Sequence, residues 1–171
     1  RKELEPNGWN IAHNLYVTDQ ARKGTSVREI DILLIHPLKG LIVVEVKGGE
    51  LERRADGRWT QNGNAMSPHK QPDKQVHQTL LRLKSALNDH EYWNALNRKP
   101  LRGVMIAMPD CDVTPTAKYQ LDQGFTFSPD MFIDRMALNR DGGVLAAVNT
   151  FCDHRASGPA ESPDRLGFVQ K

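Results

Sequence analysis

The chain has 171 residues, of which 39% are hydrophobic, so it is long enough to bury one core of its own. Its 23 Lys and Arg side chains nearly balance 21 Asp and Glu side chains, and the formal net charge of +2 argues against a generic, strongly basic nucleic-acid-coating protein. No apolar run approaches the roughly 20 residues that span a membrane, and Cys111 and Cys152 show neither disulfide-framework nor zinc-site spacing, which favours a reducing, cytoplasmic compartment.

The N-terminal segment predicts one strand after a helix end. Residues Arg1–Pro6 have the composition of the last turn of a helix, and Asn7 and Gly8 act as its stop signal. From Trp9 to Val17 apolar residues alternate, which predicts a strand with His13 on its apolar face. We interpret His13 as a half-buried strand residue in preference to a catalytic one.

Two short apolar runs follow, Ile32–Ile35 and Leu41–Val44. Both are too short for independent helices, and the turn-forming residues Pro37 and Gly40 between them predict two strands joined by a tight hairpin. The acidic residues of this segment lie only at its ends. Glu29 and Asp31 precede the first run, and Glu45 follows the second, with Val46 and Lys47 next to it.

A hairpin of this kind brings Asp31 close to Glu45. Two neighbouring carboxylates repel each other unless a cation lies between them, and Mg²⁺ accepts one or two carboxylates while keeping several waters. Lys47 shares a face with Glu45 and can hold an attacking water or offset the charge of a phosphate. These residues therefore predict metal-assisted hydrolysis of a phosphodiester. The plainer alternative is a structural hairpin with solvated charges at its mouth.

The metal hypothesis imposes a condition on the turn. Asp31 and Glu45 share a face only if the connection has an odd number of residues, as His36–Gly40 would give, or contains a β-bulge. Gly40 suits the positive φ that such a connection often needs. A four-residue loop at Pro37–Gly40 would instead separate the carboxylates onto opposite faces.

The next segments predict a second hairpin and a long helix. Leu51–Arg54 and Arg58–Gln61 flank an Asp-Gly turn, and we interpret Trp59 as a core residue in preference to a base-stacking one. From Asp73 to about Asn97 apolar residues recur at helical steps, with Pro72 suited to the first turn. Basic side chains at the start of this helix predict contacts with a nucleic-acid backbone, although a solvated helix face explains them as well: Lys70, Lys74 and Arg82.

The C-terminal half predicts one further buried strand and two helices. Arg102–Met108 follows the long helix, so it reaches the hairpin by a crossover and pairs in parallel, which gives an α/β fold with a mixed central sheet. We interpret Asp110 and Asp112 as turn residues. A short strand at Phe125–Phe127, a helix starting at Pro129 and continuing through Leu138, and a final helix at Val144–Arg155 complete the prediction.

Asp31 followed by Glu45-Val46-Lys47 resembles the PD-(D/E)xK nuclease motif. The wider segment from about Asn7 to Asn88, with the glycines after Lys47, a downstream Gly-Arg-Trp and Pro72-Asp-Lys-Gln, resembles the NERD (nuclease-related) domain. The resemblance implies a restriction-endonuclease-like αβββαβ core, here with additional C-terminal helices. It implies that Asp31, Glu45 and the Val46 carbonyl hold Mg²⁺ or Mn²⁺, and that Lys47 is the catalytic lysine.

The same resemblance implies roles outside the hairpin. Gln75 matches a helix glutamine that orients water or binds phosphate in related nucleases, although an exposed helical Gln is an equally simple interpretation. A glutamate on the first helix of such domains has only poor counterparts here, Glu3 and Glu5. Domains of this family often stand beside a helicase, kinase or other effector module. We expect residues 1–155 to form one nuclease-like domain and residues 156–171 a linker or tail.

The sequence therefore leads to a metal-dependent nuclease acting on DNA. RNA as the substrate and the mode of cutting stay open. One alternative is a non-catalytic nucleic-acid-binding module that guides a fused partner, and another is a protein-interaction domain. Carboxylates of Asp31 and Glu45 on opposite faces of the sheet would contradict the nuclease.

Overall fold

The computed structural model describes residues 2–18, 27–88, 91–95, 102–112, 119–120 and 126–156. Its main element is a five-stranded sheet in the order β1-β2-β3-β7-β10. The strands are β1 (Asn10–Thr18), β2 (Val27–His36), β3 (Gly40–Val46), β7 (Arg102–Met108) and β10 (Phe132–Asp134). The first three strands are antiparallel, and β7 and β10 continue the sheet in parallel. The predicted α/β fold with a mixed central sheet is confirmed.

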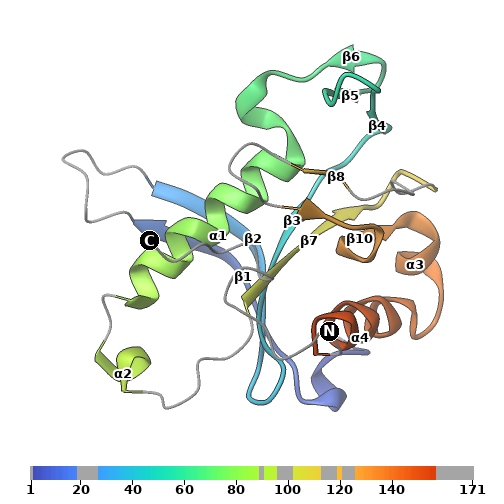
Figure 1. Ribbon diagram of the computed structural model, residues 1–171. Coiled ribbons are helices and arrows are strands. Elements are labelled where there is room, and N and C mark those ends of the chain that lie inside the picture. The colour runs from blue at the N-terminus through green and yellow to red at the C-terminus, as the bar shows by residue number, and fades with distance from the viewer. Residues whose placement is uncertain are drawn as a thin grey trace.

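Helices cover both faces of this sheet (Figure 1). The long helix α1 crosses one face, and α3 and α4 lie beside the other. The α-helices are α1 (Pro72–Asn88), α2 (Glu91–Asn94), α3 (Arg135–Asn139) and α4 (Gly143–Ala156). Three 3-10 turns accompany them: η1 (Glu5–Asn7), η2 (Pro68–Lys70) and η3 (Pro129–Met131).

Two small sheets are separate from the main one. The first joins β4 (Leu51–Arg53), β5 (Trp59–Gln61) and β6 (Asn64–Ala65), and it stands at the end of β3 where the chain leaves the main sheet. The second pairs β8 (Tyr119–Gln120) with β9 (Thr126–Phe127). The predicted hairpin with an Asp-Gly turn is confirmed, and β6 was not anticipated.

The central hairpin has the register that the metal hypothesis requires. His36 pairs with Gly40, so three residues connect the two strands. Gly40 has a φ of 102°, a conformation that favours glycine. The ring Nδ1 of His36 accepts hydrogen bonds from the backbone N–H groups of Leu38 and Lys39, both at 3.0 Å. The predicted odd connection is confirmed, and local side-chain chemistry stabilises it.

The core lies between the sheet and the helices on both faces. The central strands β3 and β7 are buried on both sides, as expected for parallel neighbours covered by helices. On α1, Val76 and Leu80 are fully buried. On the other face, Phe151 of α4 lies so close to β7 that a Cβ at Gly103 would be 2.4 Å from its ring. Glycine is therefore required at this helix–sheet contact.

Two helix predictions were wrong. The helix expected to reach Asn97 ends at Asn88, and α2 is a separate short helix. The segment after Pro129 forms η3, then strand β10, and becomes helical only at α3. Phe132 and Ile133 pair in parallel with β7 and are buried at the sheet edge. That burial outweighs the helical spacing of the apolar residues.

The expected position of His13 was also wrong, because the side chain is exposed. The next residue, Asn14, has a φ of 54°, which interrupts the alternation of side chains along β1. Within the described part of the chain, no helix has the length and apolar character to cross a membrane. Of the predicted linker, only Ala156 is described, as the last residue of α4.

Candidate active site at the open end of the central hairpin

The strands β2 and β3 separate at Asp31. Their last paired residues are Ile32 and Val44, and one further step in this register would place Asp31 opposite Glu45. At that step the Asp31 Oδ2 accepts a hydrogen bond of 2.7 Å from the Val46 backbone N–H. A side-chain carboxylate thus contacts β3 where the paired backbone of β2 ends. This bond fixes Asp31 against the C-terminal end of β3.

Glu45 is the most buried carboxylate of this group, with 6% of the residue exposed. Burial raises the pKa of its carboxyl group, and the charge of Asp31 raises it further. Lys47 and Arg28 act in the opposite direction, but burial is the largest influence. The positive charge around Glu45 is therefore too small to compensate for its loss of hydration, and an additional cation would be electrostatically favourable here.

Lys47 completes the group. Its Nζ lies 2.6 Å from the Glu45 Oε1, and its side chain is 21% exposed. Its backbone N–H donates to the Ala107 carbonyl at 2.9 Å, which extends the parallel pairing with β7 by one residue. The ammonium group is therefore held beside the carboxylates and retains access to solvent. The structure brings together Asp31, Glu45, Val46 and Lys47 as the sequence predicted.

The donor set suits a hard divalent cation with few protein ligands. Across the described ranges, no group of three His, Cys, Asp or Glu side chains is arranged to hold a metal ion. Two carboxylates nevertheless suffice for Mg²⁺, which completes its shell with waters and backbone carbonyls. The placement of the buried Glu45 carboxylate beside Asp31, at the end where β2 and β3 separate, is the observation that fits such an ion. Asp31 and Glu45 are the residues that could hold it.

The glycines after Lys47 are fixed from two sides. The Gly49 N–H donates to the Asp110 Oδ2 at 2.6 Å, and the Gly48 carbonyl accepts from the Gln61 Nε2 at 2.7 Å. Gly49 has a φ of 81°, and a Cβ there would lie 2.8 Å from the Asn62 Oδ1. Sequence reasoning missed these contacts because no local pattern links Asp110, Gln61 and Asn62 to the hairpin. The predicted turn at Asp110 is confirmed.

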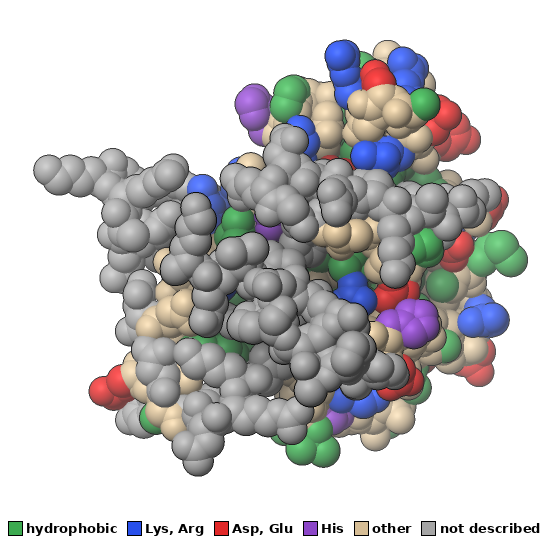
Figure 2. All heavy atoms as spheres, in the orientation of Figure 1, with side chains coloured by type: hydrophobic (Ala, Val, Ile, Leu, Met, Phe, Trp, Pro, Cys, Tyr) green, Lys and Arg blue, Asp and Glu red, His purple; other side chains and the backbone are tan. Residues whose placement is uncertain are grey.

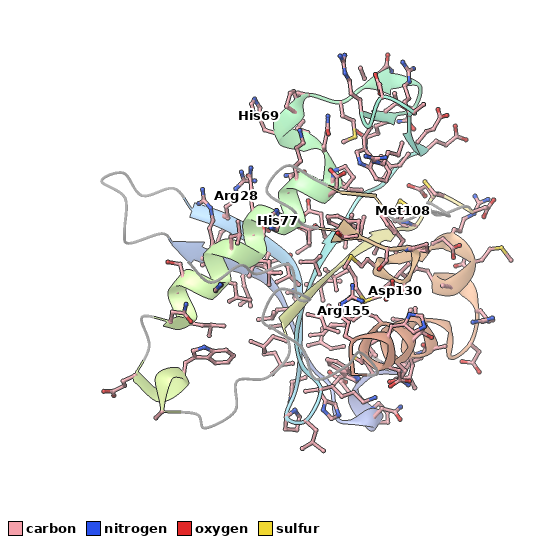
Figure 3. All side chains as sticks on the ribbon, viewed as in Figure 1. Arg28, His69, His77, Met108, Asp130 and Arg155 are labelled. Carbon is pink, nitrogen blue, oxygen red and sulfur yellow. The ribbon has the colours of Figure 1, made fainter. Side chains whose placement is uncertain are left out.

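Arg28 is a second residue that sequence reasoning missed. It extends from β2 toward α1, where His77 also lies (Figure 3). Its guanidinium donates to the Gln78 Oε1 at 2.8 Å, and its charge lowers the pKa of Glu45. Arg28 thus joins β2 to α1 on the stretch where β2 has left β3. Its position three residues before Asp31 was the only signal available in the sequence.

The start of α1 carries the predicted helix residues. Asp73 is fully buried, and its Oδ2 accepts from the Trp59 Nε1 at 2.8 Å. The Gln75 Oε1 is buried and has no hydrogen-bond partner among the described residues. A buried amide oxygen of this kind is expected where a water or ligand supplies the donor. This state agrees better with a role toward a bound group than with a solvated helix face.

The basic residues predicted to contact nucleic acid are spread along η2 and α1. Lys70 is exposed, and Lys74 and Arg82 are partly exposed. Their contact with nucleic acid stays a prediction. The poor candidate Glu3 lies elsewhere, because its carboxylate accepts from the Gly142 and Leu145 N–H groups, both at 3.2 Å. Glu3 therefore stabilises the start of α4, and Glu5 lies in η1.

Comparison with known proteins gives one match. A family model described as the nuclease-related domain (NERD) matches residues 1–107, which is more than half of the 171-residue chain. The matched span contains the first three strands, α1, the small β4–β6 sheet and nearly all of β7. No curated protein and no solved structure matches the chain.

Proposed function

The chain belongs to the nuclease-related domain family, and from this premise we propose that it is a metal-dependent nuclease that hydrolyses phosphodiester bonds in DNA. One observation carries the proposal. Asp31, Glu45 and Lys47 meet at the open end of the central hairpin, where the Asp31 carboxylate contacts Val46 and Glu45 contacts Lys47. A buried glutamate with a second carboxylate and a lysine beside it is suited to metal-assisted hydrolysis.

We propose that Asp31 and Glu45, with the Val46 carbonyl, hold Mg²⁺ or Mn²⁺. When bound, such an ion supplies positive charge that stabilises the transition state at the scissile phosphate. The protein supplies the geometry. The hydrogen bond from Val46 orients Asp31, and the position of Glu45 on a strand buried on both faces prevents its carboxylate from turning to solvent.

Lys47 and Gln75 have complementary roles in this proposal. The ammonium group of Lys47 lies 2.6 Å from the Glu45 carboxylate, where it can hold a water by hydrogen bonding and offset phosphate charge. The unpartnered Oε1 of Gln75 can accept from the attacking water. Lys70, Lys74 and Arg82 are proposed to contact the DNA backbone.

A non-catalytic nucleic-acid-binding module is the second candidate. It is favoured by one observation, the use of Glu3 to cap α4, since no first-helix glutamate joins the site within the described residues. Such a module would guide a fused helicase-like or other effector domain. The intact group of Asp31, Glu45 and Lys47 favours the enzyme.

We further propose that residues 1–155 act as one nuclease-like domain followed by a linker or tail at 156–171. The close contact of Phe151 in α4 with Gly103 in β7 supports a single unit. Cys111 and Cys152 are buried free thiols, which is consistent with a reducing, cytoplasmic compartment.

The test is cleavage of linear, circular and single-stranded DNA, with matched RNA, in Mg²⁺ or Mn²⁺ and with EDTA as the control. Glu45→Gln and Lys47→Gln are compared with Glu91→Gln, which alters an exposed carboxylate on α2. The proposal expects metal-dependent cutting that both site variants lose and the control keeps. DNA binding without cutting by the wild type would favour the binding module, and RNA cutting alone would correct the substrate.

A further inference from the structure

Residues 51–70 form a projecting arm beside the candidate active site. The arm comprises the β4–β6 sheet and η2, and Glu50 alone separates it from the glycines after Lys47. In Figure 1 it stands above the main sheet, at the end of β3 and at the start of α1. Any polymer that lies across the site and extends in this direction must pass the arm.

The arm carries the whole net charge of the chain. It contains four basic side chains and two acidic ones, a balance of +2 that equals the formal charge of all 171 residues. The remaining 19 basic and 19 acidic side chains cancel. Lys and Arg side chains gather at the top of the molecule, over the arm (Figure 2). The arm is therefore a net basic segment beside the site.

Two arginines at the tip of the arm are presented to solvent. Arg54 and Arg58 flank the turn between β4 and β5, and both are exposed. The Arg58 side chain is 74% exposed, and its Nε lies 3.5 Å from the Asp56 Oδ2, itself on a 54% exposed side chain. Exposed ion pairs of this kind contribute little. The guanidinium of Arg58 can therefore exchange Asp56 for a phosphate at small cost.

The backbone of the arm is fixed at its tip and at its base. At the tip, the Arg54 N–H donates to the Arg58 carbonyl at 2.8 Å. At the base, the Gln61 side chain donates a hydrogen bond to the Gly48 carbonyl, and the Trp59 ring donates one to Asp73 of α1. A charged surface held in place loses less entropy on binding than a mobile loop does. These hydrogen bonds connect the tip to the base of the arm, and the base to the segment that follows Lys47.

We propose that the tip of this arm, through Arg54 and Arg58, is a docking surface for the phosphate backbone of the nucleic acid cut at the hairpin. The proposal rests on the proposed function for the identity of its ligand. The length of the chain limits the distance from the site to the tip. Six residue steps at about 3.3 Å each allow at most about 20 Å between Gly48 and Arg54. At about 3.4 Å per base pair, this distance corresponds to about six base pairs.

The test is equilibrium binding of a labelled DNA duplex of about 20 base pairs in EDTA, where no cleavage occurs. The double variant Arg54→Gln/Arg58→Gln is compared with Lys2→Gln/Arg140→Gln, which removes two exposed charges outside the arm. We expect the arm variant to bind about tenfold more weakly and to lower the slope of log K against log salt by about 1.8, the value for two phosphate contacts. The control should change affinity by less than about twofold.

Asp56→Asn gives an effect of opposite sign. It removes the competing carboxylate beside Arg58, so the duplex should bind more tightly and with a steeper salt dependence. Duplex length adds a second measurement. The affinity of the wild type should rise as hairpin DNA stems grow past about six base pairs, and the arm variant should lose this rise.

These outcomes separate the arm from the catalytic proposal. Equal binding by the arm variant and its control overturns the docking surface, even if the wild type cuts DNA. Weaker binding by the arm variant supports the docking surface, even if no protein in the series cuts DNA. Loss of folding in the arm variant is excluded by an unchanged melting temperature.

Discussion

Two carboxylates on opposite sides of the sheet, the half-buried Asp130 and the buried Glu45, show how a structural charge differs from one arranged for chemistry. Asp130, in η3, accepts from Ser128 and from Arg155 at 3.1 Å, and His154 lies 3.4 Å away. Figure 3 shows Asp130 and Arg155 pointing toward each other beside α4. Glu45, on the other side, is paired with Lys47, is influenced by the charge of Arg28, and has a carboxylate neighbour, Asp31.

The two sites differ in how far the neighbouring charges compensate the carboxylate. At Asp130, the half-buried carboxylate is paired with Arg155 within the fold, and Arg155 also lies 4.3 Å from the centre of the Phe151 ring. Burial lowers the pKa of Arg155, but Asp130 acts against this shift. At Glu45, burial and Asp31 together raise the pKa of the carboxyl group. A carboxylate whose charge is not balanced within the fold favours either a proton or a bound cation, and such perturbed groups cluster at functional sites.

The largest expected effect comes from replacing Glu45. Glu45→Gln keeps the volume of the side chain but removes the charge, so kcat should fall by about 10³-fold or more. The same change removes a desolvated charge, and the protein should melt at the wild-type temperature or above it. Cleavage kinetics and thermal unfolding measure the two halves of this expectation. Lost stability with activity retained would assign Glu45 to the fold.

Lys47→Met is expected to lower kcat by about 10²-fold, because a positioned water or phosphate charge loses its partner. The change also leaves Glu45 without its basic neighbour, so the melting temperature should fall slightly. Lys39→Met is a matched control, because Lys39 donates to Asn149 at 2.6 Å beyond the closed end of the hairpin. If Lys39→Met lost as much activity as Lys47→Met, the loss would not depend on the position of Lys47 beside Glu45.

Asp130→Ala should lower stability and leave activity unchanged, which is the opposite of the result expected for Glu45→Gln. It leaves the partly buried Arg155 without its carboxylate, and the free energy of unfolding should fall by about 2 kcal/mol. Melting should occur about 5 °C lower, and kcat per folded molecule should not change. Ser128→Ala removes only one neutral donor and should cost less. Loss of kcat in fully folded Asp130→Ala would remove the distinction between the two carboxylates.

The central hairpin, which carries the candidate site, was predicted correctly because short sequence patterns determine it. Apolar runs, a Pro/Gly turn and the odd connection were enough to bring Asp31 and Glu45 together. The contacts of Arg28 and Asp110 depend on chain segments 50 and 61 residues away, and no periodicity encodes them. The Asn62-Gly63 pair is an exception, because this hairpin signal was present before β6 and was not used.

The opposite side was predicted less well for a physical reason. Phe132 and Ile133 fit a helix by spacing, and only the presence of β7 as a pairing edge makes them a strand. The Asp130 cluster likewise needs α4 to fold back onto η3 before its charges meet. Local patterns determine hairpins, whereas an edge strand and a charge cluster between distant helices depend on the assembled fold.

The smallest expected effect concerns His77, another buried ionisable side chain, which lies on α1 near Arg28. Burial lowers the pKa of His77 below its ordinary value of 6.5, so the folded protein keeps the ring neutral at pH values where the unfolded chain binds a proton. Stability should therefore be lost as the pH falls below about 6.5, by at most about 1.4 kcal/mol per pH unit, and this contribution should be constant above it. His77→Gln should remove that dependence, as measured by denaturant unfolding between pH 5 and 8 and expressed as the difference from wild type.

Because Glu45 has a raised pKa, its own titration acts in the opposite direction over acidic pH, and the Glu45→Gln background isolates His77. An unchanged slope in His77→Gln would mean that His77 binds its proton equally well in the folded and unfolded chain, and would contradict a cost of burial for the charged ring.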